Sequence, residues 1–381
     1  DITMHRKVMI NALSARGGGG QTYLINIIKY FDRKDIHITI LLTRGTNLDF
    51  SYKNIVIYEA PEITRNPIIR QIWEMVFLPW ILYRKSIDIF FCPGGTIPLM
   101  AFFQGKTITM FRNMLPFDDI QKNKYQFGFL KFRNWMLSKI MISSMMRADL
   151  VIFISKYAES VISKKIKRPL KKSTLIPHGV DFAERPYHDN PHSFSFLEAE
   201  EEYILYPSSI DVYKSQCEVI ESYSTLIKEG IAIPKLILAG SLDANKTYTK
   251  KVIELIEVNN LVNKVILTGN IPYEFMPSLY KKCKFVVYAS QTENCPNILL
   301  EAMSCNCLIL CSNFQPMPEF AKDSVLYFDP TEPDDLASQI KKVLNNDIDE
   351  DFLKEKIPEI ILQYSWQDCS NKTWKQVSEL A

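Results

Sequence analysis

The chain has 381 residues, of which 47% are hydrophobic and 23% charged, and its formal net charge is +2. This balance is typical of a globular protein and excludes a disordered chain, and no segment holds the roughly 20 uninterrupted apolar residues that would span a bilayer. The length exceeds one ordinary hydrophobic core, so two domains of about 190 residues are expected. The start, "DITMHRKVMINAL", lacks the pattern of a signal peptide, which predicts a cytoplasmic location.

Short runs rich in β-branched residues alternate with segments of helical period through the first half of the chain. The runs cover residues 7–13, 37–43, 54–60, 88–94, 106–112, 149–155 and 173–179. This alternation predicts parallel strands joined by crossover helices, which is a doubly wound α/β domain. We assign this first domain to residues 1–185.

Four consecutive glycines follow the first predicted strand, in "ARGGGGQTYL" (15–24). Glycine at a strand-to-helix turn permits a close backbone approach, and the start of the following helix favours an anion such as a phosphate. The full spacing of a dinucleotide-binding motif is absent, so a purely structural tight turn remains the alternative.

Positive charge is concentrated in the first domain. Residues 1–185 hold 28 Lys+Arg against 14 Asp+Glu, whereas the remainder holds 17 against 29. No acid lies between Asp119 and Asp149, and there basic residues alternate with aromatic ones, as in "KFRNW" (131–135). Such a stretch suits an anionic membrane surface, with an amphipathic helix whose aromatic stripe is core as the alternative. Nucleic acid is disfavoured as a partner because the chain carries no recognisable nucleic-acid module.

A polar, turn-rich segment separates the two halves and is the predicted linker, residues 186–202. After it the strand pattern restarts at 203–209, 235–241, 264–270, 285–291, 307–313 and 324–330. We therefore expect a second α/β domain at 203–362. Two such domains in tandem predict a central cleft between the carboxyl ends of two parallel sheets, where ligands of open α/β folds bind.

A lysine stands close to the start of the first helix in the second domain. "SSIDVYKSQ" (208–216) follows the strand at 203–209, and Lys214 comes just before a helix expected near Ser215. A cation at this place would add to an anion site made by the helix start. Alone it could equally be a solvated surface charge.

Two carboxylates, Glu293 and Glu301, lie in "QTENCPNILLEAMSCN" (291–306). We expect Asn294 to cap a helix in which Pro296 takes the first position. Glu293 then lies in the loop after a strand, and Glu301 lies more than one turn into the helix, too far away to share a proton. A capping acid plus a surface glutamate is the alternative, although a charge within "ILLEAM" would be costly without a ligand or partner.

The eight cysteines lie mostly in or beside apolar runs, without the paired spacing of a zinc site. Small buried thiols are the commoner interpretation of the "CNCLILC" cluster (305–311). We therefore expect no metal and no cofactor.

Taken together, these motifs resemble the retaining nucleotide-sugar glycosyltransferases of family 4. The resemblance is carried by "ENCPNILLE" (293–301), "IPHGVD" (176–181), "GNIP" (269–272) and "PEFAKDSVLYFDPTEPDDLASQIKKVL" (318–344). It implies the GT-B fold, an α/β architecture of two Rossmann-like doubly wound domains facing a central cleft. The ending "YSWQDCSNKTWKQVSEL" resembles the helix that in this family returns to the first domain, here residues 363–381.

The resemblance also implies residue roles. Glu301 would hold the ribose hydroxyls of a nucleotide sugar, Glu293 would contact the donor sugar near the reacting carbon, and Lys214 would neutralise the leaving diphosphate. Gly18 and Gly19 would approach that diphosphate from the first domain. Ser209 and Asn297 complete the predicted donor-binding set. Retention of the anomeric configuration is likewise an implication of the family.

Three departures from the family pattern concern the diphosphate. Ser209 stands where the family usually has an arginine, and "NCPN" (294–297) replaces a glycine-containing loop, in which Pro296 offers no N–H. In "FRNMLP" (111–116), Arg112 and Asn113 stand where many members have His-Asp. Arg112 is a candidate for the missing positive charge, with a plain structural loop as the alternative. His178 is a further candidate for lining the cleft or for a role in a turn.

The predicted function is transfer of a hexose from a nucleotide-diphosphate sugar to a lipid-linked saccharide, in the synthesis of a surface polysaccharide such as an O-antigen. The enzyme is expected to be metal-independent and peripheral on the inner face of the cytoplasmic membrane. A different GT-B enzyme, such as a nucleotide-sugar epimerase, and a non-catalytic sugar-nucleotide-binding subunit are the alternatives.

Overall fold

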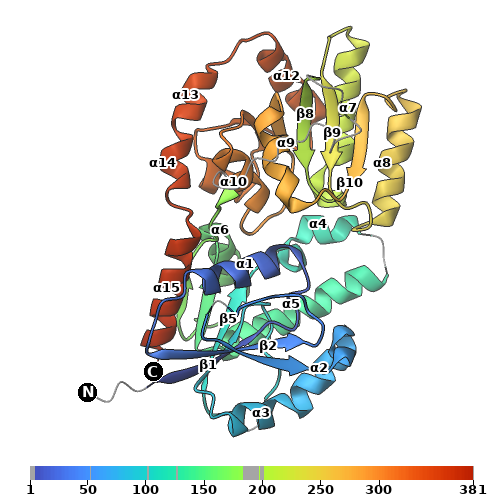
Figure 1. The fold of residues 1–381 in the computed structure, drawn as a ribbon. Coiled ribbons are helices and arrows are strands. Elements are labelled where there is room, and N and C mark those ends of the chain that lie inside the picture. Colours follow the sequence, from blue (N-terminus) through green and yellow to red (C-terminus); the bar gives the residue numbers. More distant parts are fainter. Residues whose placement is uncertain are drawn as a thin grey trace. The chain divides into compact units, whose positions relative to one another are not determined.

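A computed structural model describes residues 5–380 of the chain apart from 52, 101–102, 126–127, 183–196 and 198–200. Its contacts divide the chain into two compact units (Figure 1). The first unit comprises Asp1–Phe117, Gly128–Gly179 and Ser365–Ala381, and the second comprises Asp118–Phe127 and Val180–Tyr364. Most of the predicted linker, 186–202, lies outside the described residues.

The first unit is built on a parallel seven-stranded sheet in the order β3-β2-β1-β4-β5-β6-β7. Its strands are β1 (Arg6–Asn11), β2 (Ile36–Thr43), β3 (Val56–Ala60), β4 (Ile89–Cys92), β5 (Lys106–Phe111), β6 (Leu150–Phe153) and β7 (Ser173–Leu175). Its helices are α1 (Gly18–Lys29), α2 (Pro67–Val76), α3 (Leu78–Arg84), α5 (Phe129–Arg147), α6 (Lys156–Lys165) and α15 (Trp366–Glu379). Every strand is reached by a crossover, as the alternating sequence pattern predicts.

The second unit repeats this plan with a parallel six-stranded sheet in the order β10-β9-β8-β11-β12-β13. Its strands are β8 (Tyr203–Pro207), β9 (Lys235–Ala239), β10 (Val265–Gly269), β11 (Phe285–Tyr288), β12 (Ile309–Ser312) and β13 (Leu326–Phe328). Its helices are α4 (Asp119–Lys124), α7 (Gln216–Lys228), α8 (Lys246–Val258), α9 (Met276–Lys282), α10 (Asn297–Ser304), α11 (Met317–Ala321), α12 (Pro333–Leu344), α13 (Glu350–Glu355) and α14 (Ile357–Ile361). The prediction of two doubly wound α/β domains is confirmed.

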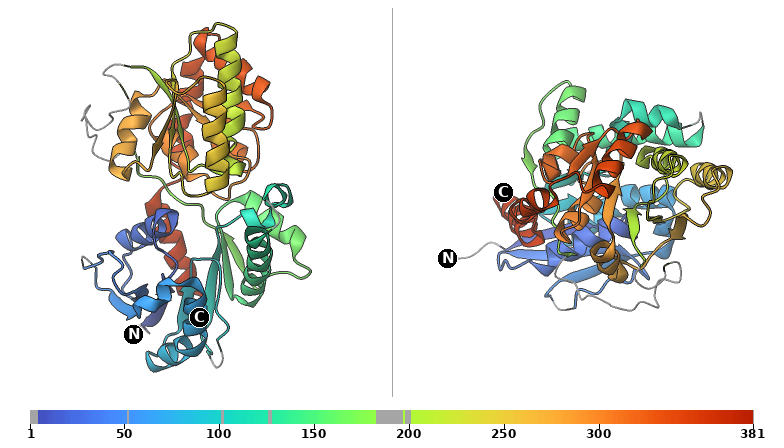
Figure 2. Two further views of the ribbon diagram at one scale, coloured as in Figure 1. Left: turned by 90° about the vertical axis from the view of Figure 1, so that its right-hand side faces the viewer. Right: turned by 90° about the horizontal axis from the view of Figure 1, so that it is seen from above.

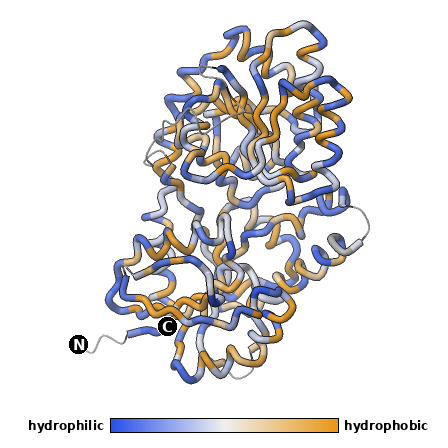
Figure 3. Tube along the Cα trace, turned by 45° about the vertical axis from the view of Figure 1, so that its right-hand side comes forward, coloured by the Kyte–Doolittle hydropathy of each residue, from blue (hydrophilic) through white to orange (hydrophobic). Residues whose placement is uncertain are grey.

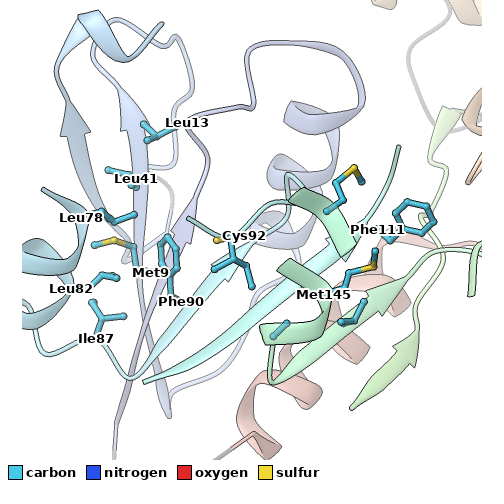
Figure 4. Packing of buried hydrophobic residues seen from close by; sticks show 14 of the residues in the cluster. Met9, Leu13, Leu41, Leu78, Leu82, Ile87, Phe90, Cys92, Phe111 and Met145 are labelled. Carbon is cyan, nitrogen blue, oxygen red and sulfur yellow. The ribbon is translucent and has the colours of Figure 1, made fainter. Parts of the chain in front are cut away.

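The cores lie between each sheet and its helices, which cover both faces (Figure 2). Because parallel strands are covered on both sides, they are hydrophobic along their length, and they form the orange interior segments of Figure 3. In the first unit, Met9 and Phe90 of neighbouring strands lie beside Leu78 and Leu82 from α3, and Cys92 belongs to the same buried cluster (Figure 4). None of the described helices is long and apolar enough to cross a membrane.

The strand order reverses beside the first strand of each sheet. In the first unit the chain leaves β1 towards β2 and later returns to β4 on its other side, and in the second unit β8 has the same position between β9 and β11. At such a reversal the loops that follow the two central strands diverge and leave a crevice at their carboxyl ends. The glycine-rich segment follows β1, residues 208–215 follow β8, and Glu293 follows β11. Each candidate segment is therefore at a reversal point.

The prediction that Asn294 caps the helix before Glu301 is wrong. α10 begins at Asn297, its N-cap position is Pro296, and no side chain accepts a hydrogen bond there. The Asn297 N–H instead donates to the carbonyl of Cys295 at 2.9 Å, which holds the segment before the helix in a tight turn. The first helical residue is therefore Asn297 itself, one turn before Glu301.

Candidate active site

The glycine-rich turn of the first unit joins β1 directly to α1. Gly17 is the N-cap residue of α1 and supplies no capping side chain, so the first N–H groups of the helix have no side-chain acceptor from it. Gly18 has φ +56, the left-handed conformation that glycine adopts without a steric penalty. Gly19 follows in the first turn of the helix. This geometry suits an anion held by backbone N–H groups.

Arg112 supplies positive charge at this turn. It follows β5, and its Nη1 lies 3.5 Å from the place where a Cβ on Gly20 would be. Its guanidinium carbon is 5.9 Å from the ring centroid of Tyr23, a residue of α1. The structure therefore brings Arg112 next to the glycine turn, as a compensating cation would require.

The other two candidates of the first unit are placed differently. Asn113 is exposed, and its Oδ1 accepts a hydrogen bond from the Leu115 N–H at 3.3 Å. The His178 ring is 2% exposed and lies between Tyr23 and Trp366, with ring centroids 5.2 and 5.4 Å away. Aromatic packing accounts for His178 in this structure, and its predicted contact with substrate stays a prediction.

Lys214 and Glu293 form an ion pair in the second unit. Lys214 ends a short 3₁₀ turn after β8, and Glu293 lies in the loop after β11, the strand next to β8. Their side chains are only 6% and 17% exposed, and Nζ of Lys214 contacts Oε1 of Glu293. Nζ also lies 4.9 and 5.5 Å from the ring centroids of Tyr213 and Tyr288. The predicted catalytic pair is thus assembled at the reversal point of the sheet.

The surroundings of Glu293 are rich in hydroxyl groups. Ser290 Oγ donates to Glu293 Oε1 at 2.6 Å. Burial, and then the negative charge of Glu293, raise the pKa of Tyr206, Tyr213 and Tyr288 above its ordinary value. These phenols therefore keep their protons at neutral pH and surround the Lys214–Glu293 pair as neutral groups.

Glu301 is held by two tyrosines of the same unit. Its Oε1 accepts from the Tyr273 hydroxyl at 2.7 Å and its Oε2 from the Tyr280 hydroxyl at 3.1 Å. The sequence predicted that this carboxylate would need a ligand or a partner, and the two tyrosine hydroxyls are such partners. Asn297 lies one helical turn earlier, and among the described residues its Oδ1 is buried without a hydrogen-bond partner.

Ser209 lies in the loop after β8 and takes part through its backbone. Its carbonyl accepts from the Gln216 Nε2 at 2.9 Å and from the Ser208 hydroxyl at 3.1 Å. These bonds hold the loop that leads to Lys214. The donor-binding role of the Ser209 side chain stays a prediction.

A polar network that was not predicted from the sequence surrounds Gln291. The Gln291 amide donates to Ser215 Oγ at 2.7 Å, and its Oε1 accepts from the Gln121 amide at 2.8 Å and from Lys124 Nζ at 2.7 Å. The Tyr125 hydroxyl donates to Asp211 at 3.0 Å. No local sequence signal marks these contacts, because they join α4 to loops about 90 and 170 residues further along the chain.

Lys124 is the second lysine that this network brings close to residues 211–215. Burial lowers the pKa of its ammonium group, and the nearby carboxylates of Glu218 and Asp118 oppose that change. Besides Lys214, the second unit thus contains a cation that the sequence had assigned to a membrane-facing stretch.

The described cysteines are all free thiols, including Cys305, Cys307 and Cys311. Burial raises the pKa of the Cys305 thiol to about 12. Among the residues that the structure describes, no group of three or more His, Cys, Asp or Glu side chains could hold a metal ion.

Comparison with known families gives two matches that follow one another along the chain. The model described as "Glycosyltransferase Family 4" matches residues 17–184, and the model described as "Glycosyl transferases group 1" matches residues 189–359. The two matches correspond closely to the two sheets of the structure.

Relatives with curated names and solved structures agree with these matches. The O-antigen chain mannosyltransferase B of Escherichia coli is 26% identical over 241 residues, which span 62% of each chain. The N-acetylgalactosamine-N,N'-diacetylbacillosaminyl-diphospho-undecaprenol 4-alpha-N-acetylgalactosaminyltransferase of Campylobacter jejuni is 23% identical over 320 residues, 81% of each chain. The structure of HepE from Anabaena in complex with UDP-glucose has a TM-score of 0.72 at 16% identity and covers 98% of this chain and 100% of its own. This likeness shows the GT-B fold.

Proposed function

The chain belongs to the glycosyltransferases of family 4 and group 1, and from this we propose that it is a retaining enzyme that moves a hexose from a nucleotide-diphosphate sugar to a lipid-linked saccharide. We place the reaction in the synthesis of a surface polysaccharide such as an O-antigen. The observation that carries the proposal is the Lys214–Glu293 pair at the strand reversal, with Asn297 and Glu301 on the helix that follows.

We assign the donor to these four side chains. Glu301 would accept hydrogen bonds from the ribose hydroxyls, and such charge-assisted bonds are stronger than neutral ones. The Oδ1 of Asn297, buried without a partner among the described residues, would accept a hydrogen bond from the donor. Lys214 would lie against the diphosphate of the donor. Glu293 would lie against the sugar that is bonded to this diphosphate.

Catalysis would consist mainly of positioning and electrostatic stabilisation. When the bond between the sugar and the diphosphate breaks, negative charge grows on the diphosphate and positive charge on the reacting carbon. Lys214 stabilises the first and Glu293 the second, and both are largely desolvated, which strengthens such interactions. A phosphate oxygen of the leaving group can take the acceptor proton, so that no separate base is needed.

The acceptor class is supported by the names of the relatives and by the surface of the first unit. The Campylobacter relative is named for a diphospho-undecaprenol acceptor and the Escherichia relative for an O-antigen chain. In this chain, Phe132 and Trp135 of α5 are 58% and 57% exposed. The alternative that the aromatic stripe of this stretch is core is therefore wrong for these two side chains.

Donor binding and transfer test the proposal. A panel of nucleotide sugars is tested first by thermal shift, because a donor at 100 times its Kd stabilises the protein by about 2.7 kcal/mol. Transfer to a saccharide on a polyprenyl diphosphate is then compared between the wild type and Glu293→Gln, with the exposed Glu257→Gln as the matched control. We expect Glu293→Gln to lose at least a hundredfold in kcat and the control to lose nothing. Full activity of Glu293→Gln would refute the mechanism, and formation of an epimerised nucleotide sugar without transfer to the acceptor would favour an epimerase.

Retention is tested by the anomeric configuration of the product. The coupling constant of the anomeric proton in the NMR spectrum of the new glycoside is compared with that of the donor sugar. The same configuration supports a retaining enzyme, and the opposite configuration overturns that part of the proposal alone.

Attachment to an anionic membrane is the remaining part of the proposal. Lys131 and Arg133 lie on α5 beside the exposed Phe132 and Trp135. We expect the protein to sediment with vesicles that contain anionic lipid, and Lys131→Ala/Arg133→Ala to weaken this binding and to lower activity on a lipid-linked acceptor. If the protein does not sediment with such vesicles and the double variant is fully active on the lipid-linked acceptor, the proposed membrane attachment is refuted.

A further inference from the structure

The first unit contains an apolar groove that the donor site does not use. A cavity of about 330 Å³ lies between α2 and α5, beside the loop that follows β4. Its wall includes Met75 from α2, Ile97 and Leu99 from the loop, and Ile140 from α5. Leu99 is 61% exposed and Met75 52%, so the groove opens to solvent.

Exposed apolar side chains also lie on α2 and α5 on the amino-terminal side of the residues that line the cavity. On α2, Ile68 and Ile72 precede Met75 at helical spacing and are exposed. On α5, Phe132 and Met136 precede Ile140 at intervals of four residues and are also exposed. Residues three or four apart share one face of a helix, so on each helix these side chains form one apolar stripe.

The groove leads away from the edge of the sheet that carries the glycine turn. α2 follows β3 and α5 precedes β6, so in a parallel sheet both helices run from the carboxyl edge back to the amino edge. Their amino ends are therefore at the same edge as the turn that follows β1. A ligand with its polar end at this edge would direct an apolar tail along the stripes.

Basic side chains lie near the glycine turn and also in the wall of the groove. Near the glycine turn, Arg70 Nη1 donates to the carbonyl of Leu13 at 3.4 Å, and Arg16 Nη2 donates to that of Thr64 at 2.9 Å. Along the groove itself, Lys139 and Arg147 are part of the wall, together with the one acidic residue among those that line the cavity, the buried Glu74. An anionic amphiphile complements this pattern, with an anion at Arg16 and Arg70 and an apolar chain between the helices.

We propose that this groove binds the first part of the polyisoprenoid chain of the lipid-linked acceptor, with the acceptor's phosphates at Arg16 and Arg70. The proposal rests on the proposed function and names the acceptor's binding site. A volume of about 330 Å³ is at the small end of ligand pockets, enough for a segment of one chain. A peptide strand is disfavoured because the edges of this sheet are β3 and β7, so a strand could not pair with β4 beside the groove.

Photocrosslinking tests occupancy without requiring turnover. A polyprenyl diphosphate with a diazirine in its first isoprene units is irradiated with the full-length protein in detergent, and the adducts are mapped by mass spectrometry. We expect adducts on Met75, Leu99 or Ile140 that unlabelled polyprenyl diphosphate suppresses. Adducts only elsewhere, or adducts that the unlabelled lipid does not suppress, would overturn the proposal.

Kinetics then test whether the groove favours acceptors that carry a long polyisoprenoid chain. The ratio of kcat/KM for a long-chain acceptor to that for a water-soluble acceptor with the same saccharide diphosphate is measured in wild type and Leu99→Glu. We expect this ratio to fall at least tenfold in Leu99→Glu and to stay unchanged in Val262→Glu, a control in the second unit with 60% exposure against 61%. An equal ratio in both variants would contradict the groove.

The two proposals fail in different ways. If no nucleotide sugar is turned over with either acceptor, the proposed function fails, and the crosslinking result alone decides whether the groove binds the lipid. If both acceptors are used equally well and Leu99→Glu changes nothing, the transferase stands and the groove proposal falls.

Discussion

The two units share one plan and differ in how they hold charge. Both place their candidate residues after the strands that flank a reversal of strand order. In the second unit these residues are already partnered, with Lys214 on Glu293 and Glu301 on Tyr273 and Tyr280. In the first unit the corresponding turn is bare backbone with Arg112 beside it.

Exposed apolar surface follows the same division. Among the described residues, most of the large apolar side chains that are exposed belong to the first unit, many of them on α2, α3 and α5. A preassembled polar site suits a rigid ligand of fixed charge such as a nucleotide sugar, because little ordering is left to be done on binding. An apolar, basic surface suits an amphiphile. Under the two proposals, one repeated fold would supply two kinds of binding site.

The largest effect that we expect is a loss of stability when the Lys214–Glu293 pair is broken, and its absence would remove the contrast between the two units. Glu293→Ala leaves an ammonium group that is only 6% exposed without its carboxylate, and breaking such a buried pair costs about 3–5 kcal/mol. Replacing both residues by apolar ones, in Lys214→Met/Glu293→Leu, should recover most of that loss because no unpaired charge remains. Urea denaturation of the wild type, Lys214→Met, Glu293→Leu and the double variant completes the double-mutant cycle.

Measuring the transferase activity of the same variants separates the effect of the pair on stability from its effect on catalysis. The double variant should be stable but inactive. If Glu293→Ala unfolds at the same urea concentration as the wild type, the pair is not the preassembled element that distinguishes the second unit. The exposed pair Lys250–Glu254, with side chains 80% and 59% exposed, is the matched control and should contribute less than about 1 kcal/mol.

A second, smaller effect is expected at Glu301. Glu301→Gln keeps one acceptor oxygen for one of the two tyrosines, offers its NH2 as a donor to the hydroxyl oxygen of the other, and removes the negative charge. Hydrogen bonds to charged groups contribute about 1.5–3 kcal/mol against about 1 for neutral ones. We therefore expect the donor KM to rise roughly 2- to 30-fold with stability nearly unchanged. Initial rates at varied donor concentration measure this. A fall in kcat at constant KM would instead place Glu301 at the reacting bond.

Much of this molecule could be predicted from its sequence, because periodicity and loop chemistry are local. The alternation of runs such as 203–209 and 235–241 predicted the two parallel sheets, which the structure confirms. The family resemblance singled out Lys214 and Glu293, but the ion pair between them was not predicted and is a finding of the structure.

What could not be predicted depends on contacts between distant segments. Gln121 is hydrogen-bonded to Gln291, 170 residues away, and no periodicity marks either residue. The tyrosine partners of Glu301 likewise come from η6 (Tyr273–Phe275) and α9. The error at Asn294 was local: a good capping residue was assigned from its type, whereas the turn before Pro296 moved the helix start to Asn297.

The smallest effect that we expect is a change in stability at Glu74, a residue of the first unit. This residue is 8% exposed and its Oε1 accepts from Asn11 Nδ2 at 2.9 Å. Burial raises the pKa of Glu74 above its ordinary value, while Asn11 and Arg70 act in the opposite direction. A carboxyl with a raised pKa in the folded state binds its proton more tightly there than in the unfolded chain, so its ionisation costs stability as pH rises past the unfolded value. Glu74→Gln removes that cost and retains an acceptor for Asn11.

The stability of Glu74→Gln relative to the wild type should therefore increase between pH 4 and pH 8. Urea denaturation of both proteins at several pH values gives this difference directly, and Glu257→Gln, an exposed change in the second unit, serves as the control and should show little dependence on pH. An advantage of Glu74→Gln that shrinks as pH rises would mean that Glu74 is stabilised as a carboxylate. Glu74 and Arg70 would then form a preformed charged pair in the first unit, and the contrast with the second unit would be lost.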